Sequence, residues 1–101
     1  MIKATVLYGH PTDPESFEKY YSATHLPLVA KASGVTKAEY TKFLPNPDGT
    51  AAAYYRMAEL YFNEPTEMQQ TMASPQGQAM AADLSNFATG GVTIIVGVVE
   101  K

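Results

Sequence analysis

Residues 92–99, VTIIVGVV, constrain the fold more than any other segment of the chain. Their β-branched side chains predict a strand, in which successive side chains alternate between two faces. One face carries Ile94, Val96 and Val98. The other carries Thr93, Ile95, Gly97 and Val99. An antiparallel sheet with one face in water carries polar residues at alternate positions, and this strand has no charge on either face. We therefore expect helices to cover one face of the sheet and a second copy of the chain to cover the other. The alternative is a central strand whose apolar composition has no role in assembly.

The rest of the chain alternates between strand-like and helix-like segments. The patterns predict strands over residues 2–8, 35–44 and 52–62, a helix over 14–25, and a helical region from about 63 to 87. Asp13-Pro14 and Ser74-Pro75 each join an N-cap residue to a proline that suits the first helical position. The order βαββαβ predicts an α+β, ferredoxin-like fold with an antiparallel four-stranded sheet, formed by a single domain over residues 1–101.

The first helix is expected to loosen near its end. Pro27 has no N–H group to bond the carbonyl of Ala23, so the regular hydrogen-bond ladder cannot pass through this point. Residues 28–30 then continue the helix, and Gly34 ends it.

Charge and composition exclude several classes of function. The 101 residues include 7 basic and 10 acidic side chains, for a net charge of −3. Arg56 is the one arginine, so the chain has neither the basic surface that binds nucleic acid nor a polybasic membrane anchor. The start lacks a signal-peptide pattern and no apolar run is long enough to span a membrane, which predicts a cytoplasmic protein.

Cofactor chemistry finds no support in the sequence either. The absence of cysteine excludes disulfides, thiolate catalysis and cysteine-ligated metals. His10, Asp13 and Glu18 offer nitrogen and oxygen ligands, but their spacing matches no known metal motif. No glycine-rich nucleotide-binding motif is present, and we expect no cofactor and no metal.

The two histidines are the strongest candidates for proton transfer. Phe17, Tyr21 and His25 are spaced four apart and share one helix face, which we expect to pack toward the sheet. His25 would then border an interior cleft and accept a proton there. The alternative is that His25 hydrogen-bonds the backbone where the helix loosens near Pro27. His10 follows the first strand in a turn, where it either lines the mouth of a pocket or lies in solvent.

Tyrosines are the main polar groups able to meet a ligand in an apolar cavity, because the chain has seven of them and no tryptophan. Tyr8, Tyr21 and Tyr55 are the candidates to hold a substrate oxygen, and ordinary packing is the alternative for each. On the third strand Tyr55 and Tyr61 are predicted to share one face and Tyr54 to lie on the other. The sequence does not indicate which of these faces meets the helices.

Two segments, residues 8–14 (YGHPTDP) and residues 24–28 (THLPL), resemble EthD-type proteins, a family named after a component of ethyl tert-butyl ether degradation. The resemblance covers nearly the whole chain, and the second segment is its most specific part. Ser33-Gly34 departs from the Pro-Gly pair that the family often has there. The resemblance implies a dimeric α/β barrel, in which two ferredoxin-like sheets pack face to face as a homodimer.

What the resemblance implies about activity is broader. Proteins of this fold include decarboxylases and other cofactor-free enzymes of polyketide pathways, monooxygenases, lactone isomerases and haem-binding enzymes. His25 matches the family's Thr-His-x-Pro segment, which favours a functional role for it. Haem binding is the weakest of these expectations, because only a lone histidine supports it.

We therefore predict a small, cofactor-independent protein that binds an apolar, cyclic or carbonyl-bearing molecule of a catabolic or biosynthetic pathway. It would transform that molecule by proton transfer, decarboxylation or oxygenation, as a lyase, isomerase or monooxygenase. His25 is the predicted catalytic residue, and the predicted substrate contacts are Tyr8, His10, Tyr21 and Tyr55. The alternative is a non-catalytic ligand-binding or accessory protein that assists a partner oxygenase.

Overall fold

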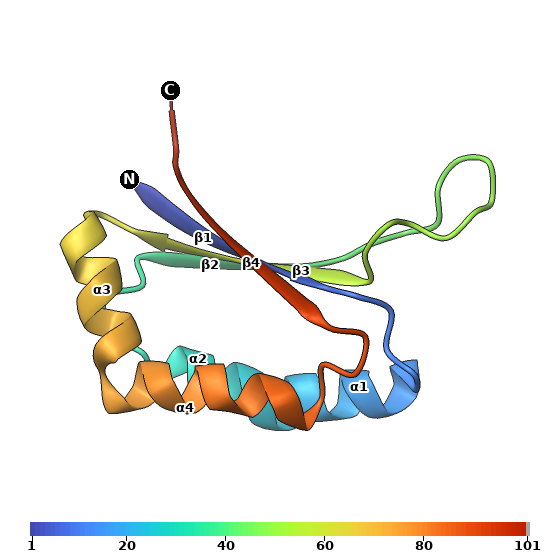
Figure 1. Ribbon diagram of the computed structural model, residues 1–101, viewed down its shortest axis with the longest axis horizontal. Coiled ribbons are helices and arrows are strands. Elements are labelled where there is room, and N and C mark those ends of the chain that lie inside the picture. The colour runs from blue at the N-terminus through green and yellow to red at the C-terminus, as the bar shows by residue number, and fades with distance from the viewer. Residues whose placement is uncertain (101) are drawn as a thin grey trace.

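The computed structural model describes residues 1–100 and shows a four-stranded antiparallel sheet with helices on one face (Figure 1). The elements are β1 (Ile2–Tyr8), α1 (Pro14–Tyr20), η1 (Tyr21–His25), α2 (Leu26–Ala30), β2 (Lys37–Lys42), β3 (Arg56–Phe62), α3 (Pro65–Ala73), α4 (Pro75–Asp83), η2 (Leu84–Asn86) and β4 (Val92–Val98). The strands lie in the order β2-β3-β1-β4, which leaves β2 and β4 at the edges. The predicted α+β, ferredoxin-like fold is confirmed.

The second and third strands are shorter than predicted. β2 ends at Lys42 and β3 begins at Arg56, whereas the sequence pattern extended them to residue 44 and back to residue 52. Pro45 and Pro47 lack the N–H groups that a strand ladder needs, so the sheet gives way to a turn closed by the N–H of Gly49 on the carbonyl of Asn46 at 2.9 Å.

The late start of β3 makes the predicted common face of Tyr55 and Tyr61 wrong. Tyr55 precedes the regular strand and is buried on the helix side, with its ring 5.1 Å from that of Phe17. Tyr61 lies on the opposite face of the sheet and donates its hydroxyl to Glu39 at 3.0 Å. The face that meets the helices carries Ala58, Leu60 and Phe62, all of them buried.

The first helical segment loosens as predicted, one turn ahead of the proline. The Asp13 side chain caps α1 by accepting the N–H of Ser16 at 3.2 Å. η1 is a π-helix, in which the N–H of Leu26 reaches back to the carbonyl of Tyr21. This wider turn accommodates Pro27, and within it the rings of Tyr21 and His25 stack with centroids 5.8 Å apart.

The second helical segment bends sharply at the predicted Ser74-Pro75 cap. Ser74 ends α3 and caps α4 by accepting the N–H of Gly77 at 3.1 Å. A Cβ atom at position 77 would collide with the backbone carbonyl of Thr71, so the bend requires glycine there. The bend turns α4 to run along the sheet beside α1 and α2 (Figure 1).

The core lies between the sheet and the helices and has an aliphatic and an aromatic part. The aliphatic part comprises Ile2, Ala4, Val29, Ala32, Leu60, Phe62 and Met80. The aromatic part comprises Tyr8, Phe17, Tyr21, Tyr55, Ala58 and Phe87. The second face of the sheet, which we call the outer face, has no helix over it (Figure 1).

Polar and apolar side chains divide the outer face between them. Lys3 and Glu59 pair there at 2.9 Å, across β1 and β3. The edge strand β4 is apolar and exposed on both of its sides, since Ile94 is 54% and Ile95 55% accessible to solvent. The helices therefore cover one face of the sheet except at β4, and the outer face is left without a helix.

Candidate functional site

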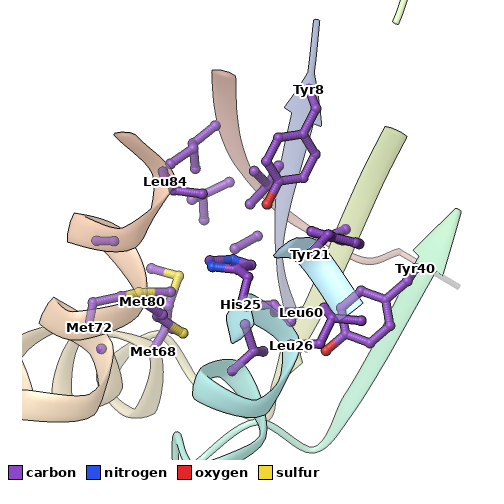
Figure 2. Close-up of a pocket in the computed structure, with 18 residues that line it drawn as sticks. Tyr8, Tyr21, His25, Leu26, Tyr40, Leu60, Met68, Met72, Met80 and Leu84 are labelled. Carbon is purple, nitrogen blue, oxygen red and sulfur yellow. The ribbon is translucent and has the colours of Figure 1, made fainter. Parts of the chain in front are cut away.

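An apolar cavity of about 180 Å³ lies between the helix-facing side of the sheet and the helices (Figure 2). All four strands contribute to its walls, as do η1, α2, α3 and α4. The walls carry methionine, leucine, valine and alanine side chains together with a histidine and three tyrosines, Tyr8, Tyr21 and Tyr40. Within residues 1–100, no side chain that lines the cavity is a carboxylate, ammonium or guanidinium group.

His25 stands at the wall of this cavity, and its imidazole is tied to a carboxylate. The ring is 4% exposed, and Nδ1 lies 2.9 Å from Oδ2 of Asp83. Asp83 also accepts the hydroxyl of Tyr20 at 2.6 Å and the amide of Asn86 at 2.9 Å. Burial acts to raise the pKa of Asp83, but the three hydrogen bonds outweigh it and hold that pKa below its ordinary value.

This network fixes the tautomer of the neutral imidazole. An ionised carboxylate can only accept hydrogen bonds, so Nδ1 of His25 carries the hydrogen in its bond to Asp83. Nε2 then has a free lone pair. A histidine oriented by a carboxylate in this way can take up a proton at Nε2 while Asp83 stabilises the resulting imidazolium.

Tyr21 brings an unsatisfied hydroxyl to the same cavity. Its ring is packed between Phe17 and His25, and its buried hydroxyl has no hydrogen-bond partner among the described residues. Burial raises the pKa of Tyr21 to about 12, although the nearby Arg56 charge acts against this. The group therefore keeps its proton at neutral pH and is available as a donor.

Tyr8 lies beside Tyr21 at the end of β1. The two rings meet edge to face with centroids 5.6 Å apart, and Tyr8 is 1% exposed. Burial is the main cause that raises the pKa of Tyr8, so this phenol also stays protonated. The cavity thus combines one proton acceptor, His25, with hydroxyl donors on neighbouring elements.

The structure brings three of the five predicted site residues together and leaves two apart. Tyr8, Tyr21 and His25 all line the cavity, and the hydrogen bond of His25 goes to a carboxylate rather than to the backbone near the proline. His10 instead donates from Nε2 to the carbonyl of Ala52 at 2.7 Å. Tyr55 donates its hydroxyl to Glu18 at 3.1 Å, and neither His10 nor Tyr55 lines the cavity.

Two residues of the site were not identified from the sequence. Asp83 lies three residues after Met80 and four before Phe87, so an acidic residue sits on the buried stripe that runs from α4 to Phe87. That placement is the signal that could have found it. Tyr40 lines the cavity from the edge strand β2, and only the strand order reveals its position.

Residues 1–100 contain no group of three or more histidine or acidic side chains arranged to hold a metal ion. None of the helices in this range has the length and apolar character to cross a membrane.

Comparison with known proteins places the chain in a family. The EthD domain model matches residues 9–91. An uncharacterized 11.0 kDa protein from the thcB-thcC intergenic region of Rhodococcus erythropolis is 42% identical over 95 residues, which cover 94% of this chain and 91% of that protein.

Solved structures agree with this assignment. An EthD family protein from Bacillus halodurans superposes with a TM-score of 0.92 at 31% identity, over 99% of both chains. A dimeric protein of unknown function with a ferredoxin-like fold, from Bacteroides fragilis, shares the fold at a TM-score of 0.67 and 16% identity, over 95% of this chain and 93% of that one. This chain therefore belongs to the EthD family.

Proposed function

We propose that this EthD-family protein binds an apolar, carbonyl-bearing small molecule in the cavity and moves a proton on it, with His25 as the base. The observation that carries the proposal is the His25–Asp83 pair at the wall of an apolar cavity. A buried histidine that is oriented by a carboxylate and lines an apolar cavity is a group suited to proton transfer.

The chemistry follows from the geometry. Nε2 of His25 takes a proton from the carbon next to the carbonyl. The electron pair of that C–H bond forms a C=C bond, and the π pair of the carbonyl moves onto its oxygen, so that an enolate forms. The hydroxyls of Tyr8 and Tyr21 supply hydrogen bonds to this oxygen, and their stabilisation grows as negative charge develops. Nε2 then returns the proton to carbon or oxygen. Throughout these steps Asp83 accepts the hydrogen bond from Nδ1–H of His25, and its negative charge offsets the positive charge of the imidazolium.

A homodimer is part of the proposal. The outer face of the sheet has no helix over it, and β4 leaves Ile95 on that face 55% exposed. Covering such a surface by a second copy would remove apolar area from water on both chains. The Bacteroides fragilis protein of the same fold is dimeric, which supports this assembly.

The second candidate function is ligand binding without chemistry, as an accessory protein for a partner oxygenase. The apolar walls favour it as strongly as they favour an enzyme, because they require only that an apolar molecule enters. The two functions differ in whether His25 exchanges a proton with the ligand.

Hydrogen–deuterium exchange at the carbon next to a carbonyl tests the proposal. Cyclohexanone in D₂O is incubated with the protein, and deuterium uptake is followed by mass spectrometry. We expect the His25→Gln variant to lose about a hundredfold of the protein-dependent rate, since Gln retains hydrogen bonding but cannot transfer protons. Tyr54→Phe, at an exposed position away from the cavity, is the control. Equal rates for the wild-type and His25→Gln proteins would favour the accessory function.

A further inference from the structure

We propose that the cavity selects a neutral molecule with one six-membered ring and one ring-attached oxygen, a cyclic ketone or its enol or phenol analogue, and rejects carboxylates. This inference rests on the function proposed above and names the class of molecule that the site takes. Four properties of the cavity lead to it: its volume, its lack of charge, its hydrogen-bonding groups and its methionine wall.

The volume suits a ligand of one ring. The cavity has about 180 Å³ and opens to solvent at Ile94 and Val96, and an apolar protein cavity of about 150 Å³ is known to bind benzene. One ring with a small substituent therefore matches the space between the walls. A porphyrin is several times larger than this volume, which disfavours haem as the ligand.

The charges around the cavity exclude an anionic ligand. Arg56 is the nearest guanidinium, 5.0 Å from the centre of the Tyr21 ring, but it is bound to Glu18 by hydrogen bonds of 2.9 and 2.6 Å. The carboxylate of Asp83 stands directly behind His25. A ligand carboxylate would lose its water, meet no free cation on the described walls and approach a negative charge, which is strongly unfavourable. Decarboxylation of a keto acid is disfavoured on the same ground.

The hydrogen-bonding groups suit an oxygen that accepts, as in a ketone, and they bind most fully one that also donates, as in an enol or phenol. The Tyr21 hydroxyl is a donor with no hydrogen-bond partner within residues 1–100, and Nε2 of His25 is an acceptor. A ring hydroxyl can accept from Tyr21 and donate to His25 through a single oxygen atom. An enol has the same pattern, so a phenol mimics the species that forms when Nε2 of His25 returns its proton to the oxygen of the enolate.

The wall formed by Met68, Met72 and Met80 favours a flat ring. These residues of α3 and α4 lie on one side of His25, and Tyr8 and Tyr40 lie on the other (Figure 2). Thioether sulfur makes favourable contacts with aromatic rings and adapts to their shape. A planar ring between the methionines and tyrosines would thus have an attractive surface on both sides.

Fluorine NMR titrations with matched probes test the proposal. The probes are 4-fluorophenol, fluorobenzene and 4-fluorobenzoate, which share one ring and differ in the substituent that would meet Tyr21 and His25. We expect 4-fluorophenol to bind about tenfold more tightly than 4-fluorobenzoate and about fivefold more tightly than fluorobenzene. Tyr21→Phe should lower the affinity for 4-fluorophenol about fivefold and leave that for fluorobenzene unchanged. Tyr54→Phe, the control, should change neither.

Several results would overturn the proposal. They are equal or tighter binding of 4-fluorobenzoate, tighter binding of the two-ring 6-fluoro-2-naphthol, or no binding of any probe at millimolar concentration. The outcome of the cyclohexanone experiment does not depend on these binding results. If the protein binds the phenol selectively but the exchange rate does not depend on His25, the proposed proton transfer is rejected and the proposed ligand class is retained. If the exchange rate depends on His25 but the protein does not discriminate among the probes, only the proposed ligand class is rejected.

Discussion

Asp83 accepts a hydrogen bond from the imidazole of His25 at 2.9 Å, although 58 residues separate the two in the chain. Each is the last residue of its helical element, η1 for His25 and α4 for Asp83. A carboxylate at a helix C-terminus is opposed by the helix dipole, and the three donors to Asp83 offset this effect together with that of burial, so that its pKa lies below the ordinary value. The orientation of the imidazole and the charge of the carboxylate are thus mutually dependent.

The Asp83→Asn substitution is expected to remove this dependence. The amide keeps the size of the carboxylate but carries no charge to stabilise an imidazolium, so the rate of cyclohexanone exchange should fall at least about tenfold. The free energy of unfolding should also fall, by about 1–3 kcal/mol, because hydrogen bonds to a charged group are lost. Exchange assays and urea denaturation measure the two effects. An unchanged exchange rate in a folded Asp83→Asn protein would contradict the role assigned to the pair.

The neighbours Tyr20 and Tyr21 are predicted to respond in opposite ways to loss of their hydroxyls. Tyr21→Phe removes a buried hydroxyl that has no partner, and should raise the free energy of unfolding by about 1 kcal/mol. Tyr20→Phe removes the 2.6 Å bond to Asp83, and should lower it by about 1 kcal/mol. Urea denaturation of both variants provides the comparison. A Tyr21→Phe protein less stable than the wild type would show that the hydroxyl is satisfied in solution.

Acid is expected to weaken the fold partly through Glu18. The hydrogen bond from Arg56 lowers the pKa of Glu18 below its ordinary value of 4.5, with burial acting against it. Because the folded-state pKa is the lower one, the stabilisation is present above pH 4.5 and is lost as pH falls through the folded-state pKa.

The Glu18→Gln variant should therefore be less stable than the wild type by about 1 kcal/mol at neutral pH and should lose this difference in acid. Thermal unfolding over a pH series measures both quantities. Glu64→Gln is the control, because the exposed Glu64 side chain makes no capping hydrogen bond. A difference between Glu18→Gln and wild type that persists unchanged at low pH would contradict the assignment.

The proposed homodimer predicts that charge on the outer face of β4 produces monomers. Ile95→Glu places a carboxylate on that face and should halve the mass found by light scattering at micromolar concentration. Leu44→Glu provides the control, since Leu44 is 81% exposed in the chain between β2 and β3. A wild-type protein that is already monomeric would remove this part of the proposal.

The fold could be predicted from the sequence because its signals are local. Asp13 and Ser74 cap helices where expected, and Pro27 loosens the first helical segment through a hydrogen bond it cannot make. The ends of the second and third strands were harder to predict, because the prolines between these strands shorten them. The prediction that Tyr55 and Tyr61 share one face was wrong for this reason, since alternation fails where the regular strand has not yet begun.

The site was only partly predictable because its parts come from distant segments. The helical spacing of Phe17, Tyr21 and His25 predicted that these residues share one face, and Tyr21 and His25 on this face line the cavity. The partner of His25 lies on α4, and nothing in local periodicity relates residue 83 to residue 25. The unsatisfied Tyr21 hydroxyl is a property of packing alone, since it depends on what every neighbouring element leaves unfilled.

The π-helix from Tyr21 to His25 has a consequence for how this site tolerates change. A π turn is an α-helix that holds one surplus residue, so deleting a single amino acid within it would restore the regular ladder. Because the wide turn absorbs the surplus residue, the helix beyond a deletion would keep its direction, and the change would be confined to the turn itself. Tyr21 and His25 would then stand three residues apart instead of four, so shortening this segment should disturb the stacking of their two rings at the cavity wall more than the path of the helix that follows.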